Sequence, residues 1–245
     1  MSFSWKRVRA IMVKELTDYR RNRFVMVFTM TLLPLIFIVA PTIQLLTAPA
    51  GASSSKLDTR VGIALLYMLL IPAIVPSTVS AYSVVGEREQ GTLEPILITP
   101  IRREELLVGK ALAVLVPTLV VAYTIFGIFL AVAALSAHTS IRSAIFAGSH
   151  IPVQVLFTPL LAGWSIWVGI AISARSSDVR VAQQLSVFAN IPPIGIVALI
   201  SFNVITASTT VAVLLAAALL AVDALGWRAV AAMFDRERLI TGTRT

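Results

Sequence analysis

The chain has 245 residues, of which 58% are hydrophobic and only 13% are charged, and its mean hydropathy is +0.90. Soluble domains carry about 25% charged residues, so this composition excludes an ordinary cytosolic enzyme and a disordered protein and indicates a membrane protein. Cysteine is absent and His138 and His150 are the only histidines, which excludes a disulfide framework, a thiolate metal site and a histidine-rich metal centre.

Residues 1–23 predict an amphipathic helix that lies in the membrane interface. Its apolar residues recur at spacings of three and four, as one helical stripe does. The stripe consists of Trp5, Val8, Met12, Leu16 and Tyr19. Tryptophan and tyrosine are typical of interfacial depth, so we expect this stripe in the acyl boundary and the neighbouring cations near lipid phosphates. The alternative is a basic orientation signal that happens to be helical.

Five long stretches contain no Asp, Glu, Lys or Arg, and a membrane helix needs about 20 mostly apolar residues. The first four stretches each hold one such helix. The fifth, residues 181–222, is 42 residues long with a polar break at 203–208, so it fits two helices. The sequence therefore predicts an all-α integral membrane protein whose six-helix transmembrane domain covers residues 24–245. The expected spans are 24–47, 62–86, 108–137, 154–174, 183–203 and 207–227.

The positions of the basic residues predict the orientation of the spans. Of the 20 Lys and Arg residues, 17 lie in the N-terminal segment, in the connections after the second and fourth spans, and in the C-terminal tail. Basic residues near spans favour the cytoplasm, so both termini are expected there. The same distribution accounts for the net charge of +8 without a nucleic-acid partner.

The connection from Gly86 to Lys110, GEREQGTLEPILITPIRREELLVGK, holds five of the 12 acidic residues and also a small apolar face. The residues of this face fall at helical spacing and are Leu93, Ile96 and Leu97. We expect Thr92 to cap a short helix here, and Thr99 to cap a second helix with Pro100 at its first position. A charged helical connection with an apolar face at the cytoplasmic surface predicts a protein partner.

The motifs of this connection resemble those of a known family. The string E-R-E-Q-G-T-L-E, then T-P after four residues, then E-x-x-x-G-K at the start of a span, resembles the permeases of ABC transporters of the type-2 exporter class. The N-terminal amphipathic helix, the six spans and the inside termini match as well. In that family the connection after the second span, here 87–107, docks on the ATPase subunit as a coupling helix.

The resemblance implies a set of ATPase-coupling residues in this chain. They are Glu87, Arg88, Glu89, Gly91, Thr92, Leu93, Glu94, Ile96, Leu97, Thr99 and Pro100. Gly109 and Lys110 then lead into the third span. Two features depart from the family pattern, since Pro95 interrupts the coupling helix and the short link between the first two spans leaves no room for a large exterior domain.

The resemblance implies a permease subunit of an ATP-driven exporter in the plasma membrane of a prokaryote. Such a subunit forms the substrate path with a second permease copy or a similar permease, within membrane lipid. A separate ABC ATPase subunit would carry ATP and Mg²⁺. The chain itself has no G-x-x-x-x-G-K-[ST] phosphate loop and no catalytic motif, so we expect no cofactor, metal or enzymatic activity in it.

Polar and helix-breaking residues inside the spans are candidates for the path or for helix packing. They are Gln184, Asn190, Pro192 and Asp223. Asp223 lies about one turn from the cytoplasmic end of the sixth span, and we expect it to pair with Arg228 or to reach water.

A self-standing secondary transporter or channel is the alternative function. It predicts charged pairs near the membrane midplane or repeat symmetry between the two halves, and the sequence shows neither. A membrane anchor or assembly factor is a third possibility. Neither alternative explains the elaborate connection after the second span. No cluster of residues selects a substrate class.

The predicted topology can be tested with single cysteines at positions 54 and 243 of this cysteine-free chain. In intact cells a membrane-impermeant maleimide should label Ser54→Cys, which lies in an exterior loop, and leave Thr243→Cys unlabelled until the cells are opened. Labelling of position 243 without labelling of position 54 would reverse the predicted orientation.

Overall fold

The computed structural model describes residues 3–47, 54–92, 101–146, 150–202 and 209–233. Within these ranges the chain is helical apart from short turns and caps, and it contains no strand. In chain order the elements are α1 (Trp5–Arg21), the π-helical η1 (Phe24–Leu32), α2 (Leu33–Leu46), α3 (Ser54–Glu89), α5 (Arg103–Ser136), α6 (Thr139–Phe146), α7 (His150–Arg175), α8 (Val179–Phe188), α9 (Ile191–Ser201) and α10 (Thr209–Met233).

Six segments of the described chain are long and apolar enough to cross a membrane. They are Val27–Leu46, Lys56–Glu89, Arg103–Ser136, His150–Arg175, Val179–Ser201 and Thr210–Met233. Together with α1 they confirm the predicted all-α membrane fold of six spans and an N-terminal helix. Several helices extend past the expected spans; α10, for example, reaches Met233. The point where the sequence stops being apolar marks the edge of the hydrocarbon layer, and a helix can continue beyond that edge.

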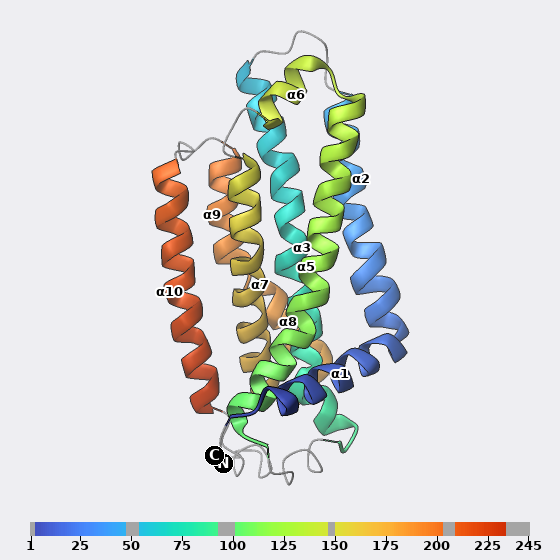
Figure 1. Ribbon diagram of the computed structural model, residues 1–245, viewed down its shortest axis with the longest axis vertical. Helices are drawn as coiled ribbons and strands as arrows, with labels where there is room; N and C mark the ends of the chain where they lie inside the picture. The colour runs from blue at the N-terminus through green and yellow to red at the C-terminus, as the bar shows by residue number, and fades with distance from the viewer. Residues whose placement is uncertain (1–2, 48–53, 93–100, 147–149, 203–208, 234–245) are drawn as a thin grey trace.

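The spans run side by side, and α1 lies across one end of them (Figure 1). At this end α3, α7 and α10 finish and α5 begins, whereas the short helix α6 lies at the opposite end. The start and the finish of the described chain are therefore at the same end of the bundle. The prediction that this end is cytoplasmic rests on its basic residues.

Helix α3 is at the centre of the bundle and packs against α2, α5, α7, α8 and α9. Its closest neighbour is α7, where Gly169 faces Ser80 and a Cβ on the glycine would lie 1.9 Å from the serine Oγ. Glycine is therefore required at this crossing. In contrast, α9 and α10 present large exposed side chains such as Ile191 and Leu225, which lipid or another chain must cover.

The fifth span is broken into α8 and α9 at Ala189 and Asn190. Pro192 and Pro193 occupy the first turn of α9, where a missing backbone N–H removes no helical hydrogen bond. The prolines thus start the second half of the span and do not disrupt its interior.

Candidate functional site

Four charged side chains meet where α1 crosses the end of α3 and the start of α5. This Lys110 cluster consists of Lys14 and Glu15 of α1, Glu87 of α3 and Lys110 of α5. Lys110 is 1% exposed, Glu15 4% and Glu87 7%. The Lys110 Nζ atom lies 2.9 Å from a Glu15 oxygen and 2.8 Å from a Glu87 oxygen, and it donates to the Ser83 carbonyl at 2.9 Å.

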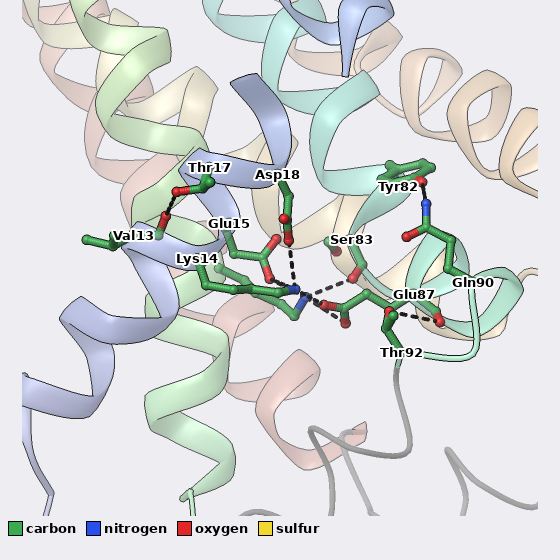
Figure 2. Close-up of polar contacts among 11 residues, drawn as sticks. Val13, Lys14, Glu15, Thr17, Asp18, Tyr82, Ser83, Glu87, Gln90 and Thr92 are labelled. Atoms are coloured by element: carbon green, nitrogen blue, oxygen red, sulfur yellow. Dashed lines mark hydrogen bonds and ion pairs between the residues drawn. The ribbon is translucent and has the colours of Figure 1, made fainter. Parts of the chain in front are cut away.

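Lys14 completes the Lys110 cluster from its solvent side (Figure 2). Its Nζ atom lies 2.8 Å from Glu87 and 3.2 Å from both Glu15 and Asp18. Two lysines and two glutamates therefore alternate in the cluster and neutralise one another. An isolated buried charge costs several kcal/mol, so each member depends on the others being present.

The pKa values of the two α1 residues, Lys14 and Glu15, are both shifted by their neighbours in the cluster. Burial alone would raise the pKa of Glu15, but Lys110 and Lys14 outweigh that effect and lower it. Burial alone would lower the pKa of Lys14, but Glu15 and Glu87 raise it. Both shifts favour the charged forms, as expected for mutually compensating charges.

A second contact fastens the start of α1 to the start of α5. The Glu105 carboxylate is fully buried and accepts hydrogen bonds from the Arg7 guanidinium at 2.7 Å through both Nε and Nη2. It also accepts from the backbone N–H groups of Ser4 at 2.7 Å and Arg102 at 3.1 Å. A bidentate arginine–carboxylate pair fixes orientation as well as distance, so this contact sets the angle between the two helices.

Gly109 allows the close approach between the two contacts. A Cβ at this position would lie 2.7 Å from the Ile11 Cγ2 atom, so any larger residue would push α1 away from α5. Glu105, Gly109 and Lys110 lie at i, i+4 and i+5 and share one face of α5. The E-x-x-x-G-K motif therefore forms the surface of α5 that receives α1.

The E-R-E motif at the end of α3 connects this helix to three other parts of the chain. Glu87 belongs to the Lys110 cluster. The Arg88 guanidinium donates to the carbonyls of Ser176 at 3.1 Å and Ala174 at 3.3 Å, at the end of α7 where helical carbonyls lack intrahelical partners. A Glu89 oxygen accepts from the N–H of Val179, the first residue of α8, at 3.2 Å. These side chains, assigned to docking by resemblance, bind other helices of the same chain.

Gly91 and Thr92 terminate α3. Gly91 has a φ of +67°, which glycine adopts without strain, and its N–H donates to the Arg88 carbonyl at 3.1 Å. The Thr92 N–H donates to the Glu87 carbonyl at 2.9 Å, which completes a Schellman motif. The Thr92 hydroxyl also donates to this carbonyl at 3.3 Å, so Thr92 closes α3, although the sequence predicts it as the cap of a following helix.

The remainder of the predicted coupling element lies outside the described residues: Leu93, Glu94, Ile96, Leu97, Thr99 and Pro100. The next described helix, α5, begins at Arg103, with Arg102 in an extended conformation as its N-cap. The sequence predicts a helix that begins with Pro100, so the observed helix starts later than expected.

The apolar stripe of α1 packs largely on protein, although the sequence predicts that it faces lipid. Val8 is 1% exposed and Tyr19 6%, whereas Trp5 is 66% exposed. Met12 and Leu16 are partly buried against the same core. Periodicity identifies the apolar face of a helix but not its partner, and here α5 covers that face. Burial, with Glu15 and Glu87 nearby, also raises the pKa of Tyr19.

Asn190 is fully buried and joins three elements inside the bundle. Its side chain donates to the Ser77 hydroxyl at 2.5 Å and the Ser186 carbonyl at 2.7 Å, and accepts from the Ser165 hydroxyl at 2.6 Å. These contacts give Asn190 a role in helix packing, since each bonding group of the side chain has a partner within the chain. Gln184 and Pro192 are exposed.

Asp223 accepts a hydrogen bond from the Trp167 indole at 3.0 Å. The sequence predicts Arg228 or water as its partner, but the indole of α7 meets the carboxylate from the neighbouring helix. The contact joins α7 to α10 near Gly163, where a Cβ would lie 3.1 Å from the Asp223 carboxylate.

Sequence reasoning did not identify Glu15, Lys14, Arg7 and Glu105 as site residues. The available signal was the position of Glu15 among the apolar residues of α1, because a carboxylate on an apolar helix face requires a buried cation. Lys110 is such a cation at the start of a span. In the part of the chain that the structure describes, no group of three or more His, Asp or Glu residues has the arrangement of a metal site.

Comparison with known proteins identifies the family of the chain. The family model described as ABC-2 family transporter protein matches residues 9–237, which include most of α1, all six spans and the complete connection after the second span. No curated protein matches the chain.

We expect Lys110→Met to lower the free energy of unfolding by about 3–5 kcal/mol, because it leaves two carboxylates buried with one exposed lysine. The measurement is the thermal unfolding of the purified chain in detergent. Combining Lys110→Met with Glu15→Gln and Glu87→Gln should restore part of the loss, since the uncompensated charges are then removed. Lys56→Met, at an exposed lysine, is the control. Equal stability of Lys110→Met and the control would contradict the Lys110 cluster.

The same contacts predict how stability depends on pH. Because the pKa of Glu15 lies below its usual 4.5, its contribution is complete above about pH 4.5 and is lost as the pH falls through the lowered value. Because the pKa of Lys14 lies above its usual 10.5, its contribution is lost only as the pH rises through the raised value. The stability difference between the parent and Glu15→Gln should therefore be constant between these limits and shrink in acid.

Proposed function

Because the chain belongs to the ABC-2 family of transporter proteins, we propose that it is the permease subunit of an ATP-driven exporter, coupled through residues 87–107 to a separate ATPase subunit. The observation that carries this proposal is the 2.8 Å ion pair between Glu87 and Lys110. These residues stand at the two ends of the connection. A displacement of the connection would therefore move α3 and α5 together and would not be absorbed by a flexible loop.

The contacts around this ion pair would transmit the same displacement to three further helices. Glu15 binds Lys110 and Lys14 binds Glu87, and both residues belong to α1, which leads directly into the first span. Arg88 forms a hydrogen bond with the end of α7, and Glu89 forms one with the start of α8. The base of the connection thus contacts five helices, and a force applied there acts on most of the bundle.

The same contacts divide the connection into two parts with different roles. Glu87, Arg88 and Glu89 are engaged within the chain and position the connection. The ATPase contact then rests on the residues between the two ends, which are Leu93, Glu94, Ile96, Leu97, Thr99 and Pro100. We infer that the three aliphatic side chains fill a hollow on the ATPase, since apolar anchors carry most of the energy of an interface. ATP and Mg²⁺ would be bound by that partner.

The pairing of permeases is the second part of the proposal. Six spans are half of the twelve that the resembled family uses, so the substrate path would form between this chain and a second copy or a similar permease. The exposed faces of α8, α9 and α10 offer apolar surface for this contact. The plasma membrane of a prokaryote is the proposed location.

Replacing two of the anchors tests the docking proposal. Leu93→Asp with Leu97→Asp should weaken ATPase binding by several hundred-fold, about 30-fold for each leucine, because loss of each buried anchor costs about 2 kcal/mol or more. The measurement is the amount of ATPase that co-purifies from membranes at matched permease levels. Leu135→Asp, a leucine that is 87% exposed at the other end of α5, is the matched control. Undiminished recovery of the ATPase with the double variant would remove the basis for docking at this connection.

The pairing proposal predicts a complex with two permease subunits. Cross-linking in membranes should produce a species of twice the permease mass, and two differently tagged copies of the chain should co-purify if the pair is a homodimer. A similar permease in the purified complex would instead indicate a heterodimer. Full ATP-driven transport by a complex that contains one permease chain would contradict pairing.

A further inference from the structure

Helix α1 has a cationic outer face that the Lys110 cluster does not use. Its inner face is buried against α5 through Val8, Ile11, Glu15 and Tyr19. The outer face is on the opposite side of the helix and consists of Lys6, Arg9, Val13, Arg20 and Arg21, all of them exposed.

The charge of the outer face is not balanced within the described chain. The two other cations of α1, Arg7 and Lys14, are paired with Glu105 and with the Lys110 cluster. The two acids of α1 are also occupied, since Glu15 binds Lys110 and Asp18 lies 3.2 Å from Lys14. The outer face therefore presents four cations and no carboxylate, which favours an anionic partner.

The outer face is at the level where the lipid-facing surface begins. In Figure 1 α1 lies across the end of the spans. Because its inner face packs on α5, the outer face is turned away from that helix. The helix continues into η1, where Val27 is 63% exposed and Phe28 44%. At its other end Trp5 is 66% exposed and packs edge-to-face on Phe3 at 5.4 Å. Exposed aromatic residues beside cations are typical of the headgroup region.

We propose that the outer face of α1 binds the headgroups of anionic phospholipids. The four cations would lie near the lipid phosphates, and Trp5 and Val13 would lie at the boundary of the acyl chains. The side of α1 that faces lipid is thus the cationic side, joined at the start of the helix by Trp5, the exposed member of the apolar stripe. This contact does not depend on an ATPase, and it would hold α1, and with it the Lys110 cluster, at a fixed depth in the membrane.

A fluorescent probe on the outer face tests the proposal in the full-length chain. Val13→Cys introduces the single cysteine of the chain and is labelled with an environment-sensitive dye. The purified protein in a neutral detergent is then titrated with dioctanoyl phosphatidylglycerol or dioctanoyl phosphatidylcholine. We expect a change in emission at a concentration of phosphatidylglycerol at least tenfold lower than of phosphatidylcholine, and we expect 0.5 M NaCl to reduce this difference.

Charge removal on the outer face supplies the specific test. Arg9→Gln with Arg20→Gln should raise the midpoint for phosphatidylglycerol about 25-fold, at about fivefold for each cation, and leave the midpoint for phosphatidylcholine unchanged. Arg175→Gln with Arg180→Gln removes two exposed arginines from the same end of the bundle and should have no effect. Unchanged folding of both variants is checked by thermal unfolding.

Three results would overturn the proposal. The first is equal midpoints for the two lipids, and the second is an Arg9→Gln, Arg20→Gln variant that titrates like the parent. Inorganic phosphate or glycerol phosphate that reproduces the change at the same concentration would show a site for free anions and not for lipid. Loss of ATPase binding by this variant with an unchanged lipid response would assign the outer face to the ATPase.

Discussion

Lys110 lies near the start of a membrane span with its side chain almost entirely removed from solvent. The arrangement of the helices at this end of the bundle follows from the need to compensate its charge. Glu87 on α3 and Glu15 on α1 supply the compensation, and Lys14 balances the second carboxylate. Replacing a buried ion pair by apolar residues is often neutral or stabilising, so stability alone does not account for this cluster. Its more specific effect is on register: apolar surfaces tolerate sliding, whereas these four charges are satisfied in one relative position of three helices.

The contacts next to the Lys110 cluster also fix the relative positions of the helices that they join. Glu105 fixes the direction of α1 through a bidentate arginine, and Gly109 fixes its distance from α5. Arg88 and Glu89 each satisfy backbone groups at the end of one helix and the start of another. The elements at this end of the bundle are thus joined by directional contacts, whereas the spans themselves meet through apolar packing and close glycine contacts such as Gly169 with Ser80. A small shift of one helix relative to its neighbour would break such directional contacts. Helices joined by them therefore move together, and a displacement of one is transmitted to the next.

The sequence predicted the fold well because apolar length reports directly on the number of spans. The family motif was also identifiable from its letters, and the chain does belong to the ABC-2 transporter family. The roles of individual residues were harder to predict. Glu87, Arg88 and Glu89 are charged residues in a polar connection, which resembles a docking surface, and only three-dimensional neighbours reveal that each has a partner within the chain. Likewise, periodicity located the apolar face of α1, but it could not show that α5 and not lipid covers it. For Asp223 the sequence predicted Arg228 or water, and it gave no sign of the Trp167 indole, which comes from a distant part of the sequence.

The Schellman motif at Gly91 and Thr92 has a consequence for how such proteins diversify. The hydrogen bonds that stop α3 run back to the carbonyls of Glu87 and Arg88, so the end of the helix is specified entirely by residues that precede position 93. On the other side, the Glu105 carboxylate accepts a hydrogen bond from the Arg102 N–H at the start of α5. The segment between them is therefore bounded by two helix ends that each have capping hydrogen bonds of their own. Under the proposed docking, substitutions in this segment would change which ATPase is recognised and leave the hydrogen bonds of both helix ends in place, so the choice of partner and the geometry of the bundle could change separately.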